Sequence, residues 1–163
     1  MREIIGIMAC TRLGVIGKDG SVPWNYPSEF KHFQDTTRGH IVIMGRKTFD
    51  EMSDLSLLNE HYNIVFSNKE KESDIENILF VKSIDEFKRI SLPREKKIYM
   101  IGGAQIAELF LKKNMIKKFL LTKINKEYDG TVYFPLSLIK GWSSRVVVSH
   151  EDYTIYEYKN LKN

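Results

Sequence analysis

Runs of apolar, mostly β-branched residues alternate along the chain with polar stretches of helical periodicity. The runs predict strands over Ile4–Met8, Ile41–Met44, Asn63–Phe66, Ile78–Val81 and Ile98–Ile101. The intervening pattern predicts helices over Ser28–Thr37, Thr48–Met52, Ser83–Ile90 and Ala104–Lys113. Such alternation is typical of an α/β fold with a mostly parallel central sheet flanked by helices.

The C-terminal part changes character. Phe119–Lys126, Ser144–Ser149 and Tyr153–Lys159 read as strands with no helix between them, which predicts an antiparallel edge. At 163 residues, the chain is long enough for one real core and short for two, so we expect a single domain over residues 1–163.

Composition places the chain among ordinary globular proteins, with 42% hydrophobic and 28% charged residues. The single cysteine, Cys10, excludes an intramolecular disulfide and any zinc cluster of several cysteines, so no metal site is expected. The apolar stretch Ile4–Cys10 is too short for a signal peptide core with a cleavage site. No run approaches the roughly 20 apolar residues of a membrane span. We expect a cytoplasmic protein without a membrane partner, and a monomer by default.

The net charge is +4 and the pI is about 9.0, which raises the question of nucleic acid. Basic and acidic residues are interspersed, and the one dense basic cluster consists of Lys112, Lys113, Lys117 and Lys118. This cluster reads as the solvated end of a helix. We therefore expect no nucleic-acid partner, and a mild positive field that suits a small anionic ligand.

Glu29 is the most informative residue, because it lies among aromatic side chains. If the segment after Pro27 is helical, Tyr26 and Phe33 share the face of Glu29, which should be buried. Burial raises the pKa of a carboxylate and makes it a usable proton reservoir near neutral pH. The alternative is a first-turn acid that faces water and is stabilised by the helix dipole.

Two strand-to-helix junctions carry glycine, at Gly45–Thr48 and Gly102–Gln105. Glycine allows close approach of a phosphate to the backbone, and a helix N-terminus supplies unpaired N–H groups. Thr48 and Glu51 form a sequence capping box that predicts where the first of these helices begins. Together the junctions suit a dinucleotide, although a glycine at such a junction, taken alone, is more often part of an ordinary turn.

A long glycine-bearing loop, Thr11–Asn25, precedes the segment of Glu29 and ends in Pro23 and Trp24. Such a loop beside a site is a candidate lid that excludes water. The alternative is a solvent loop with Trp24 packed in the core.

Across nearly its whole length the sequence resembles dihydrofolate reductases. The resemblance rests on Val15-Ile16-Gly17, Val22-Pro23-Trp24-Asn25, Glu29 with Phe33, Ile43-Met44-Gly45-Arg46-Lys47-Thr48, Ile101-Gly102-Gly103, Leu121-Thr122 and Gly130 to Phe134-Pro135. It implies an oxidoreductase that reduces 7,8-dihydrofolate to 5,6,7,8-tetrahydrofolate by hydride transfer from NADPH, a step of one-carbon metabolism and a target of antifolates.

The resemblance also implies roles for individual residues. Glu29 would bind the pterin and support protonation of N5, Trp24 would hold a water in the site, and Thr122 would be a partner of Glu29. The substrate slot would comprise Ile7, Met8, Val22, Phe30, Phe33, Met52, Leu58 and Ile101. The cofactor would contact Ala9, Ile16, Gly17, Gly20, Ser21, Gly45, Arg46, Lys47, Thr48, Ser67, Asn68, Gly102, Gly103, Ala104, Gln105 and Ile106. A cis peptide is expected between Gly102 and Gly103.

Three positions depart from the family pattern. His61 stands where an arginine grips the α-carboxylate of the substrate's glutamate tail, and a neutral imidazole cannot supply that fork. On this basis, His61→Arg would lower the KM for dihydrofolate. Ala107 replaces a tyrosine beside the nicotinamide, and Thr131 replaces an aspartate.

Two other functions remain open. A pyrimidine reductase of the riboflavin pathway would share the fold and NADPH use and would not need the missing arginine. A non-catalytic pterin- or nucleotide-binding protein on the same scaffold is the other, since fold does not fix function.

Overall fold

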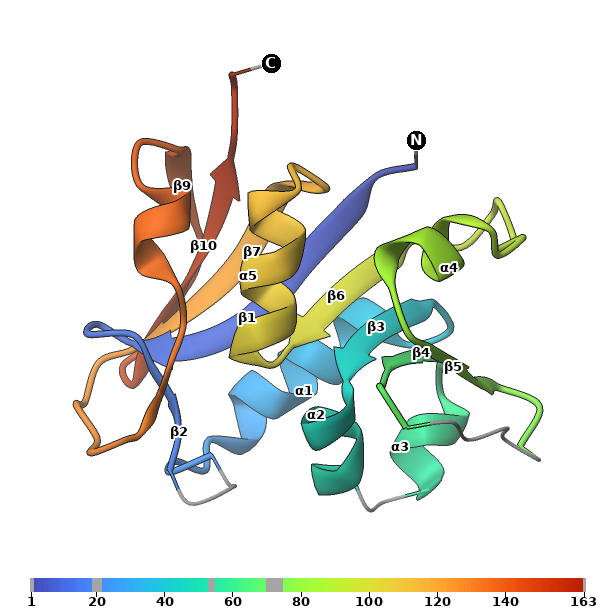
Figure 1. The fold of residues 1–163 in the computed structure, drawn as a ribbon. Helices are drawn as coiled ribbons and strands as arrows, with labels where there is room; N and C mark the ends of the chain where they lie inside the picture. Colours follow the sequence, from blue (N-terminus) through green and yellow to red (C-terminus); the bar gives the residue numbers. More distant parts are fainter. Residues whose placement is uncertain (1, 19–21, 53–54, 70–74, 163) are drawn as a thin grey trace.

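An eight-stranded sheet forms the centre of the molecule in the computed structural model, which describes residues 2–18, 22–52, 55–69 and 75–162 (Figure 1). Its strands lie in the order β5-β4-β3-β6-β1-β7-β10-β9. Their bounds are β1 Ile4–Thr11, β3 Ile41–Gly45, β4 Tyr62–Phe66, β5 Ile78–Val81, β6 Ile98–Gly102, β7 Ile116–Ile124, β9 Ser143–Ser149 and β10 Tyr153–Lys159. A separate two-stranded sheet pairs β2 (Val15–Gly17) with β8 (Val132–Tyr133).

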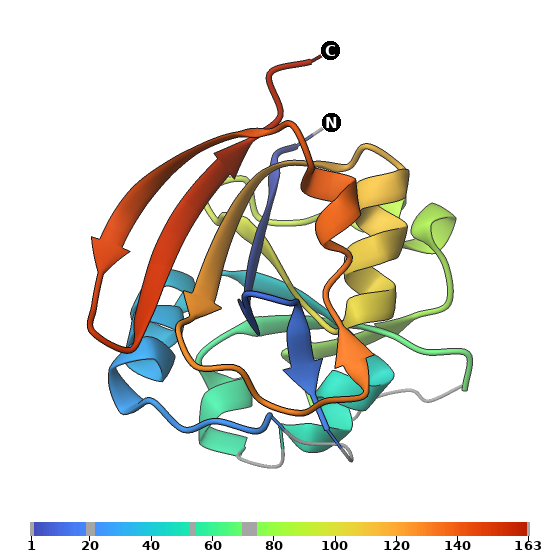
Figure 2. The ribbon, with the colours of Figure 1, turned by 90° about the vertical axis from the view of Figure 1, so that its left-hand side faces the viewer.

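The strand pairing confirms the predicted α/β class. From β5 to β7 every neighbouring pair is parallel, whereas β10 runs antiparallel to both β7 and β9. The antiparallel pair forms one outer edge of the sheet, in orange and red in Figure 2.

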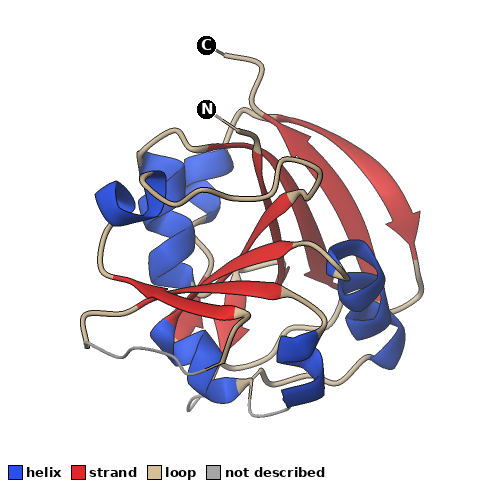
Figure 3. Ribbon diagram, turned by 90° about the vertical axis from the view of Figure 1, so that its right-hand side faces the viewer, coloured by secondary structure: helices blue, strands red, loops and turns tan. Residues whose placement is uncertain are grey.

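Helices cover both faces of the sheet (Figure 3). Their bounds are α1 Pro27–Thr37, α2 Arg46–Glu51, α3 Leu55–Asn59, α4 Ile84–Lys88 and α5 Ala104–Lys112, with a 3₁₀ turn, η1, at Leu136–Ile139. Among the described helices, none has the length and apolar character needed to cross a bilayer.

Alternation of side chains along the buried strands creates two cores. In β3, Ile41 and Ile43 face the core covered by α4 and α5, while Val42 and Met44 face the core covered by α1, α2 and α3. All four side chains are fully buried, as expected for a parallel strand covered on both faces.

Two helix and strand starts differ from the sequence prediction. Helix α2 begins at Arg46 with Gly45 as its N-cap and no side-chain cap, so the capping box at Thr48 is not used. Strand β7 begins at Ile116, three residues before the predicted start. Of the predicted basic cluster, Lys112 and Lys113 therefore lie at the end of a helix. Lys117 and Lys118 lie in β7, so the prediction that they belong to a helix end was wrong.

Strand β1 carries a glycine where it passes the ring of Phe119 on β7. A Cβ at Gly6 would lie 2.3 Å from two carbons of that ring, and Phe119 is fully buried against Phe134. The neighbouring strand therefore requires glycine here for packing, with no turn involved.

We expect Gly6→Ala to destabilise the protein by about 1–3 kcal/mol, because the methyl group overpacks a full core. Urea unfolding followed by circular dichroism would measure the change. Adding Phe119→Leu should recover part of the loss, since it removes the ring that the methyl meets. An unchanged unfolding midpoint for Gly6→Ala would contradict this packing.

Candidate functional site

A cavity of about 1010 Å³ opens at the carboxyl ends of the parallel strands. Ile7–Ala9 of β1, Gly45 of β3, Phe66 of β4 and Ile101 of β6 contribute to its lining. Strand β6 lies between β1 and β3, although it follows both in the chain. The carboxyl edge of such an open parallel sheet is where ligands bind in α/β proteins.

Helix α1 presents Glu29 to this cavity. Pro27 occupies the start of the helix, where its missing N–H costs nothing, and Glu29 follows in the first turn. Tyr26, Glu29, Phe30 and Phe33 all line the cavity. The prediction that Glu29 shares an aromatic face is therefore matched by the geometry, and the alternative of an acid directed away from the cavity is not.

Burial raises the pKa of the Glu29 carboxyl from 4.5 to about 7. Loss of solvation is the sole cause, with no charged neighbour contributing. A carboxyl group in this environment exchanges a proton near neutral pH, as a general acid or relay requires.

Hydroxyl pairs fix the start of α1 to the rest of the molecule. Ser28 Oγ lies 2.9 Å from Tyr153 OH on β10, and Tyr26 OH lies 2.9 Å from Tyr128 OH. The second pair raises the pKa of Tyr26 to about 12. Trp24 packs on Tyr128 with ring centroids 5.8 Å apart. These contacts set the direction in which the first turn carries Glu29.

Most of the predicted substrate slot lies together around Glu29. The cavity is lined by Ile7, Met8, Val22, Phe30, Phe33, Met52 and Ile101, and also by the predicted catalytic residues Trp24 and Thr122. Thr122 lies on β7 opposite Ala9 of β1. Leu58 is the exception, because it is 4% exposed in the core beneath, while its neighbour Leu57 lines the cavity.

The other end of the cavity gathers the predicted cofactor residues. Its lining includes Ala9, Ile16, Gly17, Gly45, Arg46, Lys47, Thr48, Ser67, Asn68, Gly103, Ala104, Gln105 and Ile106. Gly102 lies next to this lining, and Gly20 and Ser21 lie outside the described residues.

Arg46 is held in place at this end. Its Nε donates to Asp50 Oδ1 over 2.9 Å, and its guanidinium lies 5.9 Å and 5.8 Å from the ring centroids of Phe49 and Phe80. Its buried Nη1 has no hydrogen-bond partner. A buried guanidinium donor without an acceptor, beside the exposed Lys47, suits an anionic ligand.

Packing favours glycine at position 45, and backbone conformation favours it at position 102. A Cβ at Gly45 would lie 2.9 Å from Ile106 Cγ1, and one at Gly102 would lie 2.9 Å from Met8 Cε. Gly102 also has a φ of +114°, which favours glycine. The peptide bond between Gly102 and Gly103 is cis, which confirms that expectation.

Sequence reasoning missed ten residues of the lining: Asn25, Tyr26, His32, Asp50, Glu51, Leu57, Phe66, Lys82, Leu109 and Val132. Helical periodicity could have found His32, one turn after Glu29 on α1. Its Nε2 is buried without a partner, and burial lowers the pKa of the ring.

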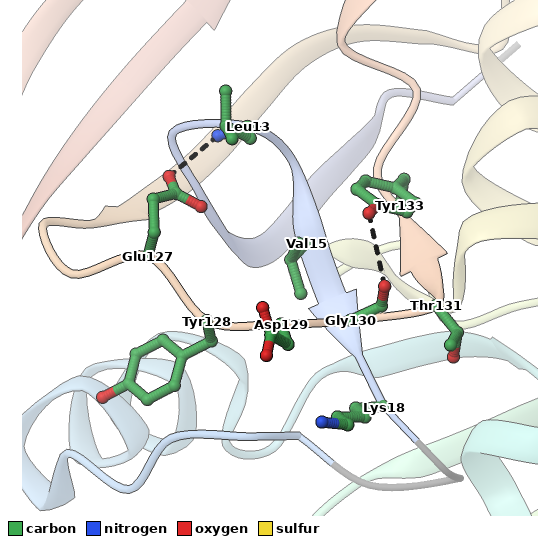
Figure 4. A pocket seen from close by; sticks show the side chains of 9 residues that line it. All are labelled: Leu13, Val15, Lys18, Glu127, Tyr128, Asp129, Gly130, Thr131 and Tyr133. Atoms are coloured by element: carbon green, nitrogen blue, oxygen red, sulfur yellow. Dashed lines mark hydrogen bonds between the residues drawn. The ribbon is translucent and has the colours of Figure 1, made fainter.

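The predicted lid is bonded to the residues on either side of β8. Phe134 N donates to Gly14 O over 2.7 Å and Thr131 N donates to Gly17 O over 3.0 Å. A second cavity, of about 530 Å³, lies at this junction (Figure 4). At this cavity, Leu13 N donates to Glu127 and links the two loops. Tyr133 donates to Gly130 O, within the β8 side of the junction.

Comparison with known proteins decides the family. The family model described as dihydrofolate reductase matches residues 3–161. The chain is 30% identical to a dihydrofolate reductase of Lactococcus lactis over 98% of both chains. It is 32% identical to that of Bacillus subtilis over 98% of this chain and 96% of the relative. For Haemophilus influenzae the identity is 35%, over 83% and 81%.

The chain belongs to the dihydrofolate reductase family. Members of this family are oxidoreductases, and we therefore assign this protein to the oxidoreductase enzymes.

Two of the three departures from the family pattern lie away from Glu29 in buried positions. His61 is 3% exposed and does not line the cavity, and its Nε2 lies 2.8 Å from Thr37 Oγ1. Ala107 is fully buried in the first turn of α5. Thr131 pairs through its backbone with Gly17, and this bond does not depend on its side chain.

We expect Glu29→Gln to stabilise the ligand-free protein above neutral pH. Folding raises the pKa of Glu29. Below about pH 4.5 the carboxyl is protonated in both the folded and the unfolded state, so it costs no folding stability. The loss of stability grows as pH rises from about 4.5 to about 7. The difference between variant and wild type should reach at most about 3 kcal/mol at pH 8. Urea unfolding at pH 4.5, 6, 7 and 8 measures it.

The matched control is Glu76→Gln, which removes an exposed carboxylate. This variant should show the pH dependence of the wild type. A Glu29→Gln stability difference that stays constant across these pH values would show that the carboxylate is not desolvated.

Proposed function

We propose that this protein reduces 7,8-dihydrofolate to tetrahydrofolate with NADPH as hydride donor. The observation that carries the proposal is Glu29, an acid desolvated in an apolar, aromatic-lined end of a cavity whose other end holds cations. The family match and the names of the relatives support the same substrate.

Glu29 suits the pterin for a geometric reason. The amino group and the adjacent ring N–H of a pterin lie side by side, and a carboxylate accepts both hydrogen bonds at once. Phe30 and Phe33 supply flat apolar surface for the ring and the benzoyl group. With a pKa near 7, Glu29 supports delivery of the proton that N5 needs when C6 is reduced.

Trp24 and Thr122 complete the polar part of this end in our proposal. Both line the cavity with Glu29, Trp24 at the end of the 11–25 loop and Thr122 on β7. We assign Trp24 to holding the water through which a proton reaches the ring, and Thr122 to orienting the acid. Val22 and Met8 add apolar surface to the lining near this point.

The residues at the other end fit a dinucleotide phosphate. Arg46 offers a buried unpaired donor, and Lys47, Thr48, Ser67 and Asn68 add a cation, hydroxyls and an amide. The N-terminus of α5 after Gly103 adds backbone donors for a pyrophosphate. Two cations together favour a 2′-phosphate, and hence NADPH over NADH.

Ala9 and Ile16 would hold the nicotinamide between the two ends. Ala9 lies beside Thr122 across the β1–β7 pair, so a ring placed there borders the pterin slot. NADPH supplies a hydride when bound, and the chain contributes orientation and exclusion of water.

We expect Glu29→Gln to lower kcat at pH 7 by about 10²-fold or more, because the amide cannot donate or relay the proton. The loss should shrink at low pH, where solvent supplies protonated substrate. Loss of NADPH absorbance on addition of dihydrofolate measures the rate for both proteins.

Equal rates for wild type and Glu29→Gln would remove Glu29 from the mechanism. Competition by a diaminopyrimidine antifolate separates the pterin site from a riboflavin-pathway site, since its amino groups need the acid. Tight binding in wild type that is lost in Glu29→Gln would support the pterin assignment. NADPH and pterin binding without turnover would favour a non-catalytic protein.

We expect Lys47→Ala to raise the KM for NADPH about 5- to 10-fold and to leave the KM for NADH unchanged, because only the first carries a 2′-phosphate. The exposed Lys47 is preferred to Arg46, whose contacts with Asp50 and Phe80 are structural. Lys112→Ala, at the far end of α5, is the control. Equal effects on both cofactors would contradict 2′-phosphate recognition by Lys47.

A further inference from the structure

The charges that line the large cavity are unevenly distributed. Arg46, Lys47 and Lys82 lie at the cofactor end with Ser67 and Asn68. At the end where α1 presents Glu29, the described polar side chains include Asn25, His32 and Thr122, and the other lining residues there are aromatic or aliphatic. Burial lowers the pKa of His32, so this ring is neutral near pH 7.

Two cations on the outside of α1 form ion pairs with acidic side chains. Lys31 Nζ lies 2.7 Å from Asp35 Oδ2, and Arg38 lies 3.2 Å from Asp35 and 3.8 Å from Glu60. Lys31 and Arg38 are 72% and 54% exposed, and neither lines the cavity. Ion pairs between exposed side chains are weak, and a contact of either cation with a further anion in water would be equally weak.

His61 is directed into the protein, behind the cavity wall. Its ring centroid lies 6.3 Å from that of Phe33, which lines the cavity, and its Nε2 contacts Thr37. Thr37 Oγ1 also bonds to Phe33 O at 2.9 Å. Burial lowers the pKa of His61, so the ring behind Phe33 gives the cavity no cation near neutral pH.

We propose that the substrate end of the site recognises the dihydropterin ring and its apolar extension, and makes no specific contact with an anionic tail. This rests on the proposed reductase function. The protein would therefore reduce dihydropterins that lack a glutamate tail about as well as dihydrofolate. The chemistry is unchanged: the hydride goes to C6, a proton goes to N5, and the nicotinamide is oxidised.

The test compares dihydrofolate with the primary amide of 7,8-dihydropteroate, which keeps the ring and the benzamide group and has no anionic tail. We expect kcat/KM values with NADPH within about fivefold of each other at 0.05 M salt, the range of a screened surface contact. The ratio should change little at 0.5 M salt. A preference for dihydrofolate larger than fivefold would overturn the proposal.

Lys31→Gln and Arg38→Gln are the matched variants. Each should leave the ratio of the two substrates unchanged, since neither cation lines the cavity. A fall in dihydrofolate kcat/KM alone in either variant would overturn the proposal by identifying a cation that binds the tail.

Equilibrium binding separates this proposal from the reductase function. Quenching of tryptophan fluorescence, with Trp24 in the cavity lining, gives Kd for both compounds without turnover. If neither compound is reduced but both bind with Kd values within fivefold, the reductase function fails and the tail independence holds. If both are reduced but dihydrofolate binds more than fivefold tighter, the tail independence fails alone.

Discussion

The site depends on the partial desolvation of one carboxylate, Glu29, in an aromatic-lined cavity. Glu29 follows Pro27 in the first turn of α1, and nothing charged compensates its burial. Burial makes the ionisation of Glu29 unfavourable. The resulting loss of folding stability grows between about pH 4.5 and 7, and core packing must offset it. Such strained placement is usual where a protein binds or reacts, and rare where a residue is only structural.

The rest of the fold holds that acid in position. The hydroxyl contacts of Tyr26 and Ser28 connect the helix start to Tyr128 and to Tyr153 of β10. Val42 and Met44 of β3 support the underside of the same face, next to Phe33 and Met52. The antiparallel edge therefore has a function in the site, although it contributes little to the cavity lining itself.

Much of this arrangement could be predicted from the sequence, because the strands are marked by β-branched runs and Glu29 by its aromatic neighbours. The failures share a physical cause. Helix α2 begins at Arg46 because Gly45 ends the strand there, whatever the capping signal at Thr48. Strand β7 includes Lys117 and Lys118 because β1 and β10 pair with this strand; Lys118 also forms an ion pair with Glu157.

The short strands could not be predicted from the sequence, for a different reason. Strands β2 and β8 have three and two residues and exist through pairing with each other, so local sequence does not mark them. Leu57 and Leu58 are adjacent and equally apolar, and only the turn of α3 decides which faces the cavity. Residue types therefore predict which chemical groups a site contains, whereas tertiary packing decides which side chains line its cavity.

Buried polar groups hold the cavity wall at Phe33 from behind. His61 lies behind Phe33, and Asn63 and Asn77 both donate to the carbonyls of Leu58 and His61, which fixes the chain at this point. The imidazole fills the space and satisfies Thr37, so the wall stays closed. Glu29 and His61 thus belong to different segments of the chain, and the Phe33–Thr37 part of α1 connects them.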